Sequence, residues 1–252
     1  MSLRAALLLL LTGLLAGCVS SGTVDPLRTD EGRQQARDAY IQLGIGYLQQ
    51  GEAARAKTPL RKALEMDPRS ADAHAALALV FQTEMENDLA DKHYREALSS
   101  RRDARILNNY GSFLFEQKRY PEAMERFRLA SEDNMYPERA RVFQNLGMTA
   151  LQLGQREEAE LYFTRSLRLD GRQPRALLEL AIMAFEDKQY VPAKRYYDSF
   201  SQVAEQNARS LLLGIRLANI HQDRDMAASL GLQLRRLYPG TDEYKQYLSE
   251  QR

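Results

Sequence analysis

The sequence is poor in the residues that disulfides, metal clusters and charge-driven binding require. Cys18 is the only cysteine, which excludes an internal disulfide and a zinc site built from several thiolates. Lysine and arginine number 35 against 34 aspartates and glutamates, and the formal net charge is +1. The chain therefore has no general excess of positive charge with which to displace counterions from nucleic-acid phosphates. We expect no nucleic-acid partner.

The short motifs of common catalytic and nucleotide-binding sites are also missing. The sequence contains no GxxxxGK[ST], GxGxxG, HExxH or GxSxG. Its three histidines, His74, His93 and His221, are expected to lie in different repeats, whereas a metal ion or a general base needs partners that converge on one point. The sequence therefore predicts neither an enzyme nor a metal site nor a small-molecule substrate.

No apolar run is long enough to span a bilayer as a mature helix. Arg4 supplies a positive charge, and the apolar residues 5–15 that follow form the core of an export signal. The signal ends in LAGC, residues 15–18, which resembles the lipobox of bacterial lipoproteins. This resemblance implies a signal peptide over residues 1–17, a diacylglycerol on the Cys18 thiol and an acylated amino terminus, for example with palmitate. The alternative is an ordinary secretory signal with a cysteine near its cleavage site.

The residues after Cys18 bear on the destination of such a lipoprotein. In lipoproteins that stay at the inner membrane of Gram-negative bacteria, an aspartate usually follows the lipidated cysteine. Here Val19 and Ser20 follow Cys18, and no aspartate is present. The resemblance therefore implies the periplasmic face of the outer membrane. Several acyl chains on one residue form a lasting anchor. No other cofactor is expected. Residues 18–36, rich in Ser, Gly, Thr and Asp, predict a flexible tether.

Beyond the tether, large and small residues recur with a period of about 34, which is typical of tetratricopeptide (TPR) repeats. The first repeat matches at every position, with Tyr40, Leu43, Gly44, Tyr47, Ala56, Leu60, Ala63 and Pro68. We predict an all-α superhelical solenoid of about six helix-turn-helix repeats, near residues 37–70, 71–103, 104–139, 140–173, 174–207 and 208–239, and a C-terminal helix over residues 240–252.

Three residues depart from the repeat pattern, and one proline falls within a predicted helix. Phe200 replaces a small residue in the fifth repeat, and Gly214 and Gly231 replace large residues in the sixth. Irregular terminal repeats are common because one of their faces lacks a neighbouring repeat. Pro59 lies several residues into the second helix of the first repeat, where we expect a local bend.

A concave surface built from first helices is the expected binding site of a TPR protein. The residues predicted to face this groove are Asp38, Ile41, Ile45, Leu48, Gln49 and Leu79. Four of these residues are apolar, although the packing of the repeat core does not require an apolar residue at their positions. An apolar groove favours an apolar or amphipathic ligand. The alternative is that this stripe packs against the start of its own helix or against the neighbouring repeat.

Several segments closely resemble one family. RDAYIQLGIGYLQQG, AKTPLRKALEMDP, SADAHAALALVFQTEM, NNYGSFLFEQKRY and NARSLLLGIRLA are similar to segments of the TPR lipoprotein pilotins of the type IV pilus in pseudomonads and their relatives. The resemblance implies a non-enzymatic factor that enters the lipoprotein sorting machinery. It also implies that the groove of the first repeat binds the pilus secretin subunit.

In that family the bound secretin is escorted to the outer membrane and multimerises there, which permits pilus assembly and twitching motility. The lipidated residue would be Cys18. Two alternatives share the lipid anchor and the fold. They are TPR lipoprotein scaffolds for β-barrel assembly and scaffolds for peptidoglycan hydrolases.

Overall fold

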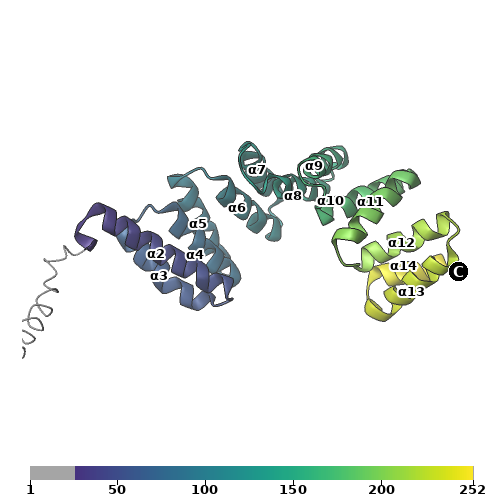
Figure 1. Ribbon diagram of the computed structural model, residues 1–252, viewed down its shortest axis with the longest axis horizontal. Coiled ribbons are helices and arrows are strands. Elements are labelled where there is room, and N and C mark those ends of the chain that lie inside the picture. The colour runs from purple at the N-terminus through teal and green to yellow at the C-terminus, as the bar shows by residue number, and fades with distance from the viewer. Residues whose placement is uncertain (1–25, 252) are drawn as a thin grey trace, which may run out of the picture. The chain divides into compact units, whose positions relative to one another are not determined.

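The computed structural model describes residues 26–251, in which thirteen α-helices and one short 3-10 helix occur and no strand does. The helices follow one another in chain order (Figure 1). They are η2 (Pro26–Arg28), α2 (Asp30–Gln49), α3 (Ala53–Met66), α4 (Ala71–Thr83), α5 (Asn87–Ser100), α6 (Ala104–Glu116), α7 (Tyr120–Ser131), α8 (Arg139–Gln152), α9 (Arg156–Leu169), α10 (Pro174–Glu186), α11 (Tyr190–Val203), α12 (Ala208–Ile220), α13 (Arg224–Leu237) and α14 (Asp242–Glu250). The predicted all-α class is confirmed. The predicted signal peptide and Cys18 lie outside the described residues.

Twelve of the helices pack as six consecutive pairs, from α2 with α3 to α12 with α13. Helices α4, α6, α10 and α12 begin at Ala71, Ala104, Pro174 and Ala208, the first residues of four expected repeats. The chain divides into two compact units, one that ends at Arg101 and one from Arg102 onward. The first unit contains α2 to α5 and the second contains α6 to α14.

The two helices of a pair approach closely where a glycine faces a large side chain. A Cβ atom placed on Gly111 of α6 would lie 2.7 Å from the Cδ1 atom of Phe127 on α7, which is closer than van der Waals contact permits. Gly44 of α2 faces Leu60 of α3 in the same way. In the fourth repeat, Gly147 of α8 faces Phe163 of α9. Small residues at this repeat position therefore permit the helix packing that the sequence pattern predicts.

Helix α2 begins earlier than the predicted tether allows. The Thr29 hydroxyl accepts a hydrogen bond of 3.0 Å from the Gly32 amide, and Asp30 and Glu31 place negative charge in the first turn. Such a cap and such charges both stabilise a helix N-terminus. The tether expected over residues 18–36 is therefore helical from Asp30 onward. The polar composition predicted a linker, but the same polar residues also cap a helix.

The second helix of the first pair continues through Pro59. The residue is buried, and the helical segment Ala53–Met66 has no break. The bend expected at this position thus does not divide the helix, although the proline ring leaves the Arg55 carbonyl without its usual helical donor.

Tyrosines from neighbouring elements explain the two glycines of the sixth repeat. A Cβ atom on Gly214 would lie 2.7 Å from Cζ of Tyr197 on α11, and one on Gly231 would lie 2.8 Å from Cζ of Tyr247 on α14. Each ring fills the space that a large residue occupies in the other repeats. Phe200, the third departure from the pattern, is also buried.

Candidate interaction surfaces

The predicted groove stripe on α2 is only partly open. Ile41 is 4% exposed and forms an apolar cluster with Ala63 of α3 and Ala73 of α4. Ile45 and Leu48 are half-buried against the same pair of helices. Packing against the neighbouring repeat, which was the structural alternative for this stripe, therefore accounts for Ile41.

The rest of the stripe remains accessible. Leu79 on α4 is half-buried, and Asp38 and Gln49 are exposed. The Asp38 carboxylate accepts a hydrogen bond of 2.7 Å from Arg37, whose guanidinium also lies 3.0 Å from Asp67. The hydrogen bond that Arg37 donates to Asp38 is the largest cause that raises the pKa of Arg37. The accessible stripe thus consists of the half-buried apolar residues Ile45, Leu48 and Leu79 and the exposed polar residues Asp38 and Gln49.

Helix α2 carries a second apolar surface, which we call the end face and which consists of Tyr40, Leu43 and Tyr47. Leu43 is 48% exposed, and the end face borders a shallow hollow of about 300 Å³. Two cations flank it, because the Arg55 guanidinium lies 4.3 Å from the centre of the Tyr47 ring and the Lys62 ammonium 5.4 Å from that of Tyr40. These are cation–π contacts.

The repeat pattern predicts that all three end-face residues lie in the repeat core, so it does not reveal this surface. In the sixth repeat, the residue at the position of Leu43 is covered by Tyr197 of the preceding helix pair. No helix pair precedes α2 among residues 26–251. The place of Leu43 in the first recognisable repeat is the signal that could have revealed its exposure.

Two of the three histidines lie in contact, so the expectation that they fall in different repeats was wrong. The Nδ1 atoms of His74 on α4 and His93 on α5 are 2.9 Å apart, and Nε2 of His74 lies 3.1 Å from the Pro68 carbonyl oxygen. Both residues belong to one helix pair, and the His93 ring also stacks on Phe81 at 5.3 Å.

The surroundings of the histidine pair disfavour the charged form of His93. If Nε2 of His74 donates to the Pro68 carbonyl, Nδ1 of His74 accepts from His93. Burial, followed by the charge of His74, lowers the pKa of His93 to about 4. Within residues 26–251, no three His, Cys, Asp or Glu side chains are grouped as a metal site would need.

The same part of the chain offers no helix that combines the length and the apolar character needed to cross a membrane. The helix pairs also present accessible apolar surfaces. They suit the recognition of a peptide or a helix, as is usual for repeat proteins.

Comparison with known proteins identifies similar repeats and similar whole chains. One family model described as a tetratricopeptide repeat matches residues 102–171, and another with the same description matches residues 41–83 and 145–200. The type IV pilus assembly protein PilF of Pseudomonas aeruginosa is 61% identical over 251 residues, which cover 99% of this chain and 100% of that protein.

Two solved structures are also similar along most of the chain. A structure described as a functional characterisation of Pseudomonas aeruginosa PilF is 62% identical, with a TM-score of 0.85, and covers 87% of this chain and 99% of its own. The crystal structure of PilW, described as a widely conserved type IV pilus biogenesis factor, is 31% identical, with a TM-score of 0.71. That match covers 85% of this chain and 99% of PilW.

Proposed function

Since this chain belongs to the PilF family of type IV pilus biogenesis factors with TPR repeats, we propose that it is the pilotin of a pilus secretin. The observation that carries the proposal is the 61% identity to PilF over the whole of that protein. The LAGC sequence that ends at Cys18 supports a lipid anchor, and the TPR fold supports a role in binding another protein.

In this proposal the protein acts by tethering and not by catalysis. Acyl chains on Cys18 engage the lipoprotein sorting machinery and hold the chain on the periplasmic face of the outer membrane. The helix pairs bind an unassembled secretin subunit. Confinement of several subunits to one membrane surface raises their effective concentration and so promotes multimerisation without any new contact.

The proposed secretin-binding surface is the accessible stripe of the first two helix pairs. It consists of the half-buried apolar residues Ile45, Leu48 and Leu79 and the exposed polar residues Asp38 and Gln49. Ile41 supports this surface indirectly, because its buried side chain packs α2 against α4. Such a combination of apolar and polar residues suits an amphipathic segment.

Membrane fractionation tests the anchor. Cells that express wild type, Cys18→Ala or Val19→Asp are separated into inner and outer membranes, and secretin multimers are located in each. We expect Cys18→Ala to remove multimers from the outer membrane. Val19→Asp retains the acylated cysteine but supplies the inner-membrane signal, so we expect it to leave the secretin at the inner membrane. Unchanged multimers in both variants would refute a lipid-driven escort.

Two charge insertions on different faces of the first unit test the binding surface. Leu79→Glu alters the accessible stripe, whereas Leu43→Glu alters the end face and is the matched control. Both positions are accessible enough for the variants to fold, which circular dichroism verifies. We expect only Leu79→Glu to reduce secretin multimers. If Leu43→Glu alone reduces them, the end face binds the secretin and the groove assignment is wrong.

A further inference from the structure

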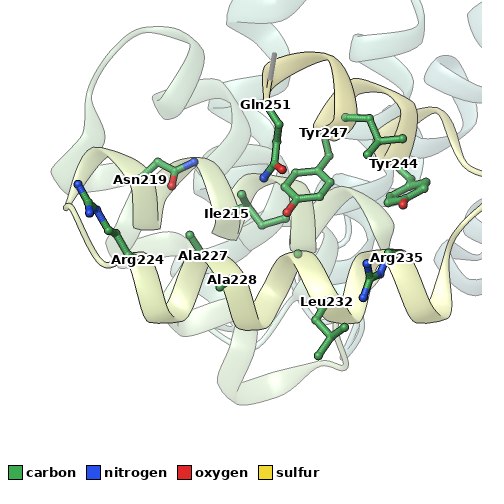
Figure 2. Close-up of a pocket in the computed structure, with 12 residues that line it drawn as sticks. Ile215, Asn219, Arg224, Ala227, Ala228, Leu232, Arg235, Tyr244, Tyr247 and Gln251 are labelled. Atoms are coloured by element: carbon green, nitrogen blue, oxygen red, sulfur yellow. The ribbon is translucent and has the colours of Figure 1, made fainter.

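The last three helices enclose an open cleft of about 580 Å³ in the second unit (Figure 2). The lining residues come from α12, α13 and α14, and Ile215 lies at its base. The cleft retains exposed apolar side chains, since Leu232 is 55% and Leu248 is 45% exposed. Tyr247 reaches from α14 toward α13 across this region.

The charged residues that line the cleft are all cationic. They are Arg224 and Arg235, at the two ends of the lining stretch of α13 (Figure 2). Neither guanidinium forms an ion pair or a side-chain hydrogen bond with any residue in 26–251. Glu250 on α14 pairs with Arg216, whose Nε atom lies 3.2 Å from the Glu250 carboxylate. The cleft therefore combines exposed leucines with two guanidinium groups that form no ion pair with any residue in 26–251.

We propose that this cleft docks an acidic amphipathic helix of a protein partner. An apolar helix face would cover Leu232 and Leu248, and carboxylates at its two ends would pair with Arg224 and Arg235. These arginines are separated by about three helical turns, or about 16 Å along α13. A guanidinium binds a carboxylate through two parallel hydrogen bonds, so each end of such a helix would be fixed.

Charge argues against a second copy of the chain as the occupant. The exposed apolar end face of the first unit is flanked by Arg55 and Lys62, which have the same sign as the arginines of the cleft. Like charges brought together at an interface disfavour the contact. The proposal is also independent of secretin binding, which we place on the first unit.

Designed peptides test the proposal with the lipidated full-length protein in detergent. The acidic probe is a fluorescent helix about four turns long, with leucines on one face and glutamates about three turns apart. The basic probe replaces these glutamates with lysines. We expect the wild type to bind the acidic probe about tenfold more tightly than the basic one at low salt, and less tightly as salt is added.

Charge reversal locates the binding. Arg235→Glu is expected to weaken acidic-probe binding about tenfold, whereas Arg236→Glu, an equal charge change at an exposed neighbour outside the cleft, is expected to alter it less than about twofold. The double variant Arg224→Glu/Arg235→Glu should prefer the basic probe, and this rescue excludes misfolding as the cause.

Three outcomes would overturn the proposal. The first is no saturable binding of the acidic probe, and the second is an equal effect of Arg235→Glu and Arg236→Glu. The third is binding to phosphatidylglycerol vesicles, with the same dependence on Arg235, in place of binding to the peptide. That result would assign the cleft to an anionic lipid surface.

Discussion

Several glycines lie so close to a large side chain that no larger residue fits without a shift in packing. We predict that Gly111→Ala destabilises the protein by about 1–3 kcal/mol, because the new methyl group would overlap the buried Phe127 ring. Gly46→Ala is the control, since a Cβ atom there meets no atom within 4 Å. It should instead stabilise helix α2 by about 0.5–1 kcal/mol. Chemical denaturation of both variants measures the contrast, and equal effects would contradict it.

The His74–His93 contact makes stability depend on pH. The folded-state pKa of His93 is lowered to about 4 from 6.5, so the unfolded chain binds a proton that the folded chain rejects between these values. Stability is therefore fully present above about pH 6.5 and is lost as the pH falls toward 4. Because His93 remains partly exposed to solvent, we discount the effect to about 1–2 kcal/mol.

A variant isolates this dependence from the titration of carboxylates. His93→Gln retains a hydrogen-bonding side chain next to His74 but cannot titrate. Its free energy of unfolding should fall less than that of the wild type between pH 7 and 5. His221→Gln, at an exposed histidine, is the matched control for the loss of one imidazole. Parallel pH profiles of His93→Gln and the wild type would show that the contact does not act in this way.

At this scale the sequence predicts core residues well and exposed ones poorly. Ala63 and Leu60 are completely buried, as their repeat positions require. Leu43 is not, because burial at its position depends on the preceding helix pair and not on the residue itself. The histidine contact was also missed, since it depends on which faces α4 and α5 turn toward each other.

Among the elements, several ion pairs link helices of successive repeats, and the pair between Glu179 and Arg209 has a buried carboxylate. Glu179 on α10 is 5% exposed and accepts hydrogen bonds of 2.6 and 3.0 Å from Arg209 on α12. The hydrogen bond with Glu179 is the largest cause that raises the pKa of Arg209. We predict that Arg209→Ala costs about 2–3 kcal/mol, because it leaves a buried carboxylate without its partner.

Two further variants distinguish loss of the partner from loss of packing. Glu179→Gln/Arg209→Ala should recover part of the stability, since a neutral amide is less costly to bury than a charge. Arg102→Ala, which breaks an exposed pair with Glu132, should cost less than about 1 kcal/mol. Thermal melting compares them, and a double variant no more stable than Arg209→Ala would argue that packing dominates.

The first residue of a helix was predictable where the repeat pattern determines it. It was less predictable where a local side-chain cap determines it. Ala71 and Ala104 follow from the spacing of large and small residues. The start of α2 does not, because Thr29 lies before the first repeat and acts through one hydrogen bond of its side chain. Composition alone cannot distinguish such a cap from a linker.

On the scale of the molecule, the main helix contacts join elements no more than two apart in chain order. Damage to one core should therefore remain local. We predict that Phe163→Ala, at a fully buried position in α9, costs about 3–5 kcal/mol. Amide hydrogen exchange should accelerate in α8 and α9 while α2 to α5, in the other unit, stay protected. Uniform acceleration would show that the two units unfold together.

An array of similar repeats could in principle continue without limit, because each helix pair presents the same kind of surface to the next pair. At Gly231 this succession stops, because the side chain that would receive another pair is absent and the Tyr247 ring of α14 occupies its place. The Tyr247 ring thus caps the sixth helix pair, and another helix pair could pack against Gly231 only if α14 were displaced. In terms of assembly, α14 blocks end-to-end polymerisation through this surface.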